Sequence, residues 1–79
     1  MSDASERLRS IGRTLKGQAA RNGLLAEEQE SAGEKYLAIA ARVDAAITAA
    51  ELDVLSRELE ELNALTTART DRIMLLNQL

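Results

Sequence analysis

The sequence predicts an all-α protein, either a helical hairpin or a small three-helix protein, because three observations agree. Helix-favouring Ala, Leu, Glu and Arg dominate the 79 residues, and proline is absent. β-branched and aromatic residues are too few to build strands. In the final third, leucines recur at alternating spacings of three and four residues, which keeps their side chains on one side of a helix. We therefore expect helices packed through this leucine surface.

The first predicted helix covers residues 4–22 and is basic and weakly amphipathic. Gly12 and Gly17 each cost about 1 kcal/mol relative to alanine in a helix interior, so we expect this helix to need docking against a neighbour. Asp3 and Glu6 match a capping box at its start, and Gly23 is a candidate left-handed stop at its end. One face carries the apolar residues Ala4, Leu8, Ile11, Leu15 and Ala19, and the opposite side carries Arg9, Arg13 and Lys16.

Residues 23–30 are acidic and are compatible with either a loop or another helical turn; they are interpreted as a linker, and a central helix is expected over 31–47. Ser31 and Glu34 match a capping box for its start. The apolar stripe of this helix is Tyr36, Ile39, Val43 and Ile47. A second, smooth face of Ala38, Ala41 and Ala45 would let another helix approach closely. With two apolar faces, the central helix is expected to lie between neighbours.

A C-terminal helix is expected over 49–77, separated from the central helix by a break. If the central stripe continued at 100° per residue, it would reach Arg57 and Glu61, whereas the leucines lie roughly 120° away. Thr48 and Glu51 also match a capping box. These observations favour a tight αα-hairpin near residues 47–50, with one continuous helix from residue 31 as the alternative.

The C-terminal helix carries the predicted protein interface. Arg69 interrupts its apolar surface, so it either pairs with an acid across an interface or extends its head to water. Apolar residues surround most of the helix circumference near its end, and one face cannot bury all of them. The predicted interface, here called the leucine row, consists of Leu52, Leu55, Leu59, Leu62, Arg69, Ile73, Leu76 and Leu79.

Charge is distributed unevenly along the chain. Residues up to 22 hold five bases and two acids, whereas residues 23–62 hold ten acids and three bases. The basic segment is therefore expected either to fold against the acidic body of the protein or a second subunit, or to contact an acidic protein. Nucleic acid is disfavoured because the net charge is −3 and no aromatics interleave with the bases. Candidate partner contacts are Arg9, Arg13, Lys16 and Tyr36, the last being either a core residue or a recognition anchor.

Chemistry at a catalytic or metal site finds little support in the sequence. His and Cys are absent, and no serine or threonine has a recognisable base, so we expect no catalytic residue, no metal and no cofactor. No export signal and no bilayer-length apolar run is visible, which favours a soluble, cytoplasmic protein without a membrane partner.

The sequence therefore suggests a non-enzymatic protein–protein interaction module. A 79-residue chain without disulfides rarely has a sufficient core alone, so we expect a homodimer, as a helical bundle or an antiparallel coiled coil. The expected role is that of a small regulator, inhibitor or adaptor that occludes a larger protein with its helix faces. The alternatives are a structural subunit of a larger phage or secretion assembly and a nucleic-acid-binding protein that uses its basic helix.

Overall fold

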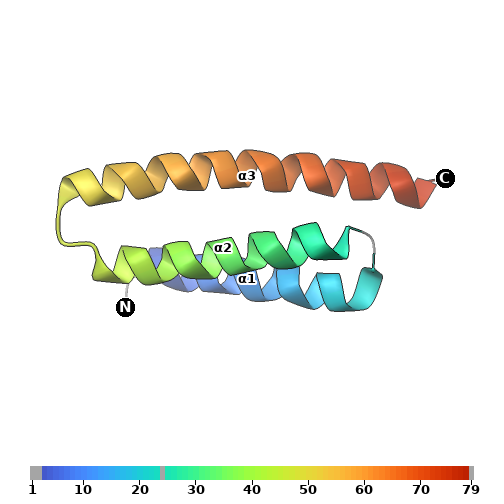
Figure 1. Cartoon of the computed structure of the whole chain (residues 1–79), viewed down its shortest axis with the longest axis horizontal. Coiled ribbons are helices and arrows are strands. Elements are labelled where there is room, and N and C mark those ends of the chain that lie inside the picture. Colours follow the sequence, from blue (N-terminus) through green and yellow to red (C-terminus); the bar gives the residue numbers. More distant parts are fainter. Residues whose placement is uncertain (1–2, 24, 79) are drawn as a thin grey trace.

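The protein is an all-α, three-helix protein. A computed structural model describes residues 3–23 and 25–78, except for the side chain of Asn22. The helices are α1 (Asp3–Asn22), α2 (Ala26–Ala45) and α3 (Ala49–Gln78), and consecutive helices run antiparallel (Figure 1). α1 and α3 begin and end within one residue of the predicted 4–22 and 49–77 helices.

The connection between α1 and α2 is shorter than the sequence suggests. Only residues 23–25 separate the two helices, so the acidic linker predicted over 23–30 is wrong beyond residue 25. Gly23 has a φ of 69°, the left-handed conformation that commonly ends a helix. Glu27 and Glu28 lie in the first turn of α2, where carboxylates favour the positive end of the helix dipole. The acidic residues thus start a helix and do not form a linker.

The central helix consequently begins five residues earlier than predicted. Ser31 and Glu34 lie inside α2, so the capping box assigned to them is wrong. α2 ends at Ala45, two residues before the predicted end.

The break between α2 and α3 is confirmed, and its capping hydrogen bonds explain it. The backbone N–H of Glu51 donates to Thr48 Oγ1 over 3.2 Å, and the backbone N–H of Ile47 donates to Glu51 Oε2 over 3.2 Å. These bonds satisfy amide groups that have no partner within the helix. The Thr48–Glu51 capping box therefore separates α2 from α3 without a glycine or a proline at the break.

α1 and α2 approach each other closely at two glycines. A Cβ placed on Gly12 would lie 2.7 Å from the carbonyl oxygen of Gly33, and a Cβ on Gly33 would lie 2.7 Å from that of Gly12. The close approach predicted at Ala38, Ala41 and Ala45 is therefore wrong, since all three are exposed. The buried side of α1 is formed by Ser5, Leu8, Gly12, Leu15 and Ala19.

The close approach at Gly12 and Gly33 also explains why two residues predicted on the buried face of α1 are not buried. Ala4 and Ile11 were expected on the buried side, but both are exposed. Because Gly12 faces α2, the adjacent Ile11 is rotated away from the interface.

α2 lies between the other two helices, as predicted. Tyr36 and Ile39 of α2 form a common core with Leu55 and Leu62 of α3, and Leu8 and Leu15 of α1 join it. No Cα pair between the described residues of α1 and α3 lies within 8 Å. α3 extends past the end of the α1–α2 hairpin, and the molecule is elongated, with axes of 47, 19 and 18 Å (Figure 1).

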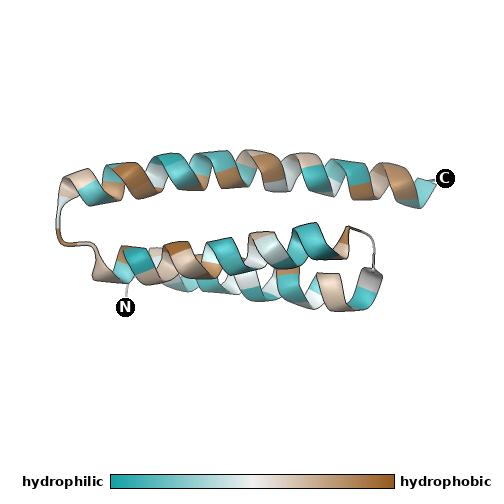
Figure 2. Cartoon of the chain, viewed as in Figure 1, coloured by the Kyte–Doolittle hydropathy of each residue, from teal (hydrophilic) through white to brown (hydrophobic). Residues whose placement is uncertain are grey.

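The leucine row is only partly covered by α2. Leu55 and Leu62 are buried, Leu59, Arg69 and Ile73 are half-buried, and Leu52 and Leu76 are exposed. Leu79 lies outside the described residues. Figure 2 shows hydrophobic segments along the whole length of α3, including the part beyond the hairpin. α2 has 20 residues and α3 has 30, so α2 cannot cover all of them.

Candidate protein-binding groove

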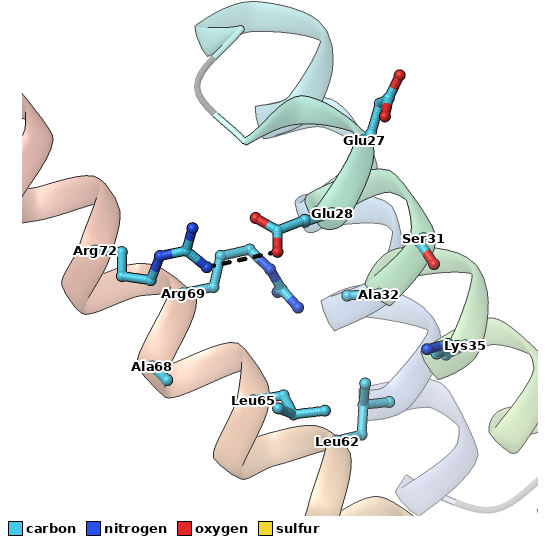
Figure 3. Close-up of a pocket in the computed structure, with 10 residues that line it drawn as sticks. All are labelled: Glu27, Glu28, Ser31, Ala32, Lys35, Leu62, Leu65, Ala68, Arg69 and Arg72. Carbon is cyan, nitrogen blue, oxygen red and sulfur yellow. Dashed lines mark hydrogen bonds and ion pairs between the residues drawn. The ribbon is translucent and has the colours of Figure 1, made fainter.

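An open groove runs between α2 and α3. One part of it has a volume of about 520 Å³ and is shown in Figure 3. Both helices contribute apolar and charged side chains to this part: Glu27, Glu28, Ser31, Ala32 and Lys35 from α2, and Leu62, Leu65, Ala68, Arg69 and Arg72 from α3. A groove of this kind can receive the apolar face of an amphipathic helix, for which Ala32, Leu62 and Leu65 provide apolar surface.

The groove continues toward the α2–α3 connection. A second part, of about 350 Å³, shares Lys35, Leu62 and Leu65 with the first. A third part, of about 310 Å³, shares Arg42 with the second and reaches Val54. No described residue of α1 lines any of these three parts, so α1 leaves this side of α2 and α3 open.

Apolar residues of α3 stand along the edge of the groove. Leu65 is 60% exposed, Val54 is 49% exposed and Leu76, further along α3, is 42% exposed. The sequence analysis did not assign Val54 or Leu65 to an interface because they lie outside the leucine row. The sequence does contain a feature that places them on one side of a helix. Val54, Leu65 and Leu76 are spaced 11 residues apart, which is close to three helical turns.

Two ion pairs bridge α2 and α3 along the groove. Arg42 Nη1 lies 2.7 Å from Glu58 Oε2, and Arg72 Nη1 lies 3.5 Å from Glu28 Oε1 (Figure 3 shows the second pair). All four side chains are about half exposed, so each pair adds little to stability by itself. Their effect is to fix the positions of charges beside the apolar edge.

Arg69 points from α3 toward α2, into the groove (Figure 3). Its Nε and Nη1 atoms are buried and have no hydrogen-bond partner among the described residues. Of the two arrangements expected for Arg69, pairing with an acid is not seen for Nε and Nη1 within the single chain, and these two nitrogens do not reach water. Arg69 thus brings a positive charge to the groove, which favours an acidic residue on a bound partner.

Tyr36 lies in the core and is therefore not available for contact with a partner. Its side chain is 2% exposed, and its hydroxyl donates to Asn63 Oδ1 and lies 3.3 Å from Thr66 Oγ1. The interpretation of Tyr36 as a candidate partner contact is wrong for this reason. The alternative, a core residue, is the one observed, and the hydroxyl is satisfied by α3.

The basic residues of α1 lie partly against acidic residues of α2. Arg9 pairs with Asp44 and Glu6, and Lys16 Nζ lies 3.9 Å from Glu34 Oε1. The N-terminal segment thus folds against the acidic body, one of the arrangements expected from the charge distribution. Of the predicted basic contacts, Arg9 is engaged within the chain, whereas Arg13 is exposed.

The Arg9–Asp44 pair ties the start of α1 to the end of α2. A hydrogen bond from Ser5 and a second from Arg9 hold the pKa of Asp44 below its ordinary value of 3.8. The hydrogen bond to Asp44 likewise raises the pKa of Arg9. These shifts indicate that the charged forms of both groups stabilise the hairpin.

The described part of the chain contains no group of three His, Cys, Asp or Glu side chains placed to hold a metal ion. No described helix combines the length and apolar composition that crossing a bilayer requires.

Comparisons with protein-family models, curated protein sequences and solved structures find no match for this chain. The groove and its charges are therefore the basis for inferring a function.

Proposed function

We propose that this protein is a non-enzymatic protein–protein interaction module that binds another protein chain in the groove between α2 and α3, as a small regulator or adaptor does. The observation that carries the proposal is Leu65, a large apolar side chain that stands 60% exposed at the edge of an open groove. A row of exposed apolar residues beside a groove is typical of surfaces that receive a helix.

The exposed area of the chain supports the same conclusion. The chain exposes 5446 Å², whereas a compact monomer of 8.6 kDa exposes about 4,700 Å² by the usual dependence of surface on mass. The excess of about 750 Å² is close to the ~800 Å² that each partner buries in a standard protein–protein interface. The three helices thus leave uncovered about as much surface as one bound partner would cover.

The test compares two substitutions that introduce the same charge. Leu65→Glu places a carboxylate at the edge of the groove, and Ile47→Glu places one on the α2–α3 connection, where Ile47 is 89% exposed and lines none of the three parts of the groove. Tagged protein is expressed in the source cells, and mass spectrometry quantifies the chains that it retains. Far-UV circular dichroism verifies that both variants remain helical.

We expect the wild-type protein and Ile47→Glu to retain the same chain in near-stoichiometric amount, and Leu65→Glu to lose it. The proposal is wrong if no chain is retained in such an amount, or if Leu65→Glu retains it as well as Ile47→Glu does.

A further inference from the structure

We propose that the chain bound in the groove is a second copy of this protein, with the two α3 helices antiparallel and Leu65 on the two-fold axis. This inference rests on the proposed function, because it names the occupant of the same groove. It follows from the arrangement of charge along the exposed edge of α3.

The edge of α3 has a spacing that reads the same in both directions. Its positions are 54, 58, 61, 65, 69, 72 and 76, separated by 4, 3, 4, 4, 3 and 4 residues. At 100° per residue these positions stay on one side of the helix. Here this set is called the outer row. A two-fold symmetric interface needs such a row, because residue i must meet residue j while j meets i.

The chemistry of the outer row is self-complementary in the antiparallel direction. With Leu65 opposite its own copy, Val54 lies opposite Leu76, so apolar residues meet at the centre and at both ends. Between them, Glu58 lies opposite Arg72, and Glu61 lies opposite Arg69. Each contact occurs twice, which gives four pairs of opposite charge.

The parallel direction lacks this complementarity. A parallel pair about the same row places each residue opposite its own copy, so that Glu58 and Glu61 each face a like charge, as do Arg69 and Arg72. Like charges in direct opposition are destabilising. The outer row therefore selects the antiparallel orientation.

Arg69 gains what it lacks in the single chain. Its side chain lines the groove without an ion pair to another described residue, and Glu61 is exposed on the same groove. In the antiparallel dimer Glu61 of one copy lies opposite Arg69 of the other. A carboxylate is the acceptor that suits the planar guanidinium best.

The existing ion pairs do not oppose this arrangement. Glu28 pairs with Arg72, and Arg42 pairs with Glu58, within one chain. Across the dimer axis these two pairs join into a network of alternating sign, because Arg72 of one copy meets Glu58 of the other. The outer row spans about 33 Å at 1.5 Å per residue.

The experiment reverses one exposed charge at a time and then mixes the variants. Glu58→Arg places Arg opposite Arg72 twice in a homodimer, and Arg72→Glu places Glu opposite Glu58 twice. When the two variants are mixed, both cross-axis pairs regain opposite charges. Glu60→Arg is the matched control, because Glu60 is exposed on α3 and lies outside the outer row.

Size-exclusion chromatography with light scattering reads out the mass at one fixed concentration. We expect the wild-type protein and Glu60→Arg to show twice the mass of the 8.6-kDa chain. Each single reversal should weaken the dimer at least tenfold, and mixing should restore it. Restoration on mixing cannot come from contacts within one chain, because each variant keeps its altered intrachain contact with Arg42 or Glu28.

The inference is overturned if the wild-type protein is a monomer, if neither reversal weakens the dimer, or if the mixture stays monomeric. A monomer that still captures a different protein through Leu65 would refute the dimer and leave the proposed function standing. A monomer that captures nothing would refute both.

Discussion

Replacing Gly12 by alanine tests the close contact between α1 and α2. The added Cβ would lie 2.7 Å from the Gly33 carbonyl oxygen and 2.9 Å from Leu37 Cγ, distances that real Cβ atoms do not adopt. Because a backbone oxygen cannot rotate away, α1 and α2 must move apart. Gly17 provides the matched control, since a Cβ placed there meets nothing within 4 Å.

The size of the effect follows from these distances. Reaching an ordinary contact requires a shift of about 0.7 Å, and a gap of ~0.5–1 Å forfeits a quarter to a half of each neighbouring dispersion contact. Overpacking of this kind costs about 1–3 kcal/mol. Alanine in place of glycine gains about 1 kcal/mol of helix propensity at either position. Gly17→Ala should therefore stabilise the protein by about 1 kcal/mol, and Gly12→Ala should lower its stability by up to ~2 kcal/mol.

Thermal unfolding followed by far-UV circular dichroism at one protein concentration measures the difference. Helix propensity cancels between the two variants, so the remaining difference of about 1–3 kcal/mol is the cost of the overlap. Each kcal/mol corresponds to about 4–8 °C in Tm for a domain of this size. If Gly12→Ala is as stable as Gly17→Ala, the close packing of α1 on α2 is wrong.

Three further predictions test other parts of the structure. Leu62→Ala should cost about 2–5 kcal/mol of unfolding free energy because Leu62 is buried. Leu52→Ala should cost much less because Leu52 is exposed. Equal costs of the two substitutions in urea denaturation would contradict the packing of α3 on α2. Tyr36→Phe should cost about 0.5–1.5 kcal/mol in the same assay through the lost hydrogen bond to Asn63, and an unchanged stability would show that this bond contributes nothing. Asp44 has a lowered pKa, so its stabilising contribution is complete above the ordinary pKa of 3.8 and is lost as pH falls through the lowered value. Asp44→Asn should remove this part of the acid-dependent loss of Tm, and an unaltered pH profile would contradict the Asp44 hydrogen bonds.

Helix content and the α2–α3 break could be predicted from the sequence because both depend on local chemistry. Composition favours helix everywhere, and the Thr48–Glu51 cap acts within four residues. The start of α2 was mispredicted by the same kind of reasoning. Ser31 matches a cap, but Glu27 and Glu28 already suit a first turn, and nothing local distinguishes the two starts.

Packing between helices could be predicted only in part. The burial of Leu55 and Leu62 follows from their spacing, but the Gly12–Gly33 contact depends on how two segments 21 residues apart are aligned. Without that alignment, glycine is simply a weak helix former. The outer row was missed for a related reason, because charged residues separate Val54, Leu65 and Leu76 and hide their common side.

The position of α2 between α1 and α3 has a consequence for how the protein unfolds. No Cα pair between the described residues of α1 and α3 lies within 8 Å, so these two helices approach each other only through side chains, as where Leu15 of α1 and Ile73 of α3 line the same pocket. Substitutions on the two outer helices that lie outside the common core and this pocket should have additive effects on the unfolding free energy, since distant sites without shared neighbours behave independently. A substitution in α2, by contrast, weakens two interfaces at once, which makes the middle helix the element that determines cooperativity.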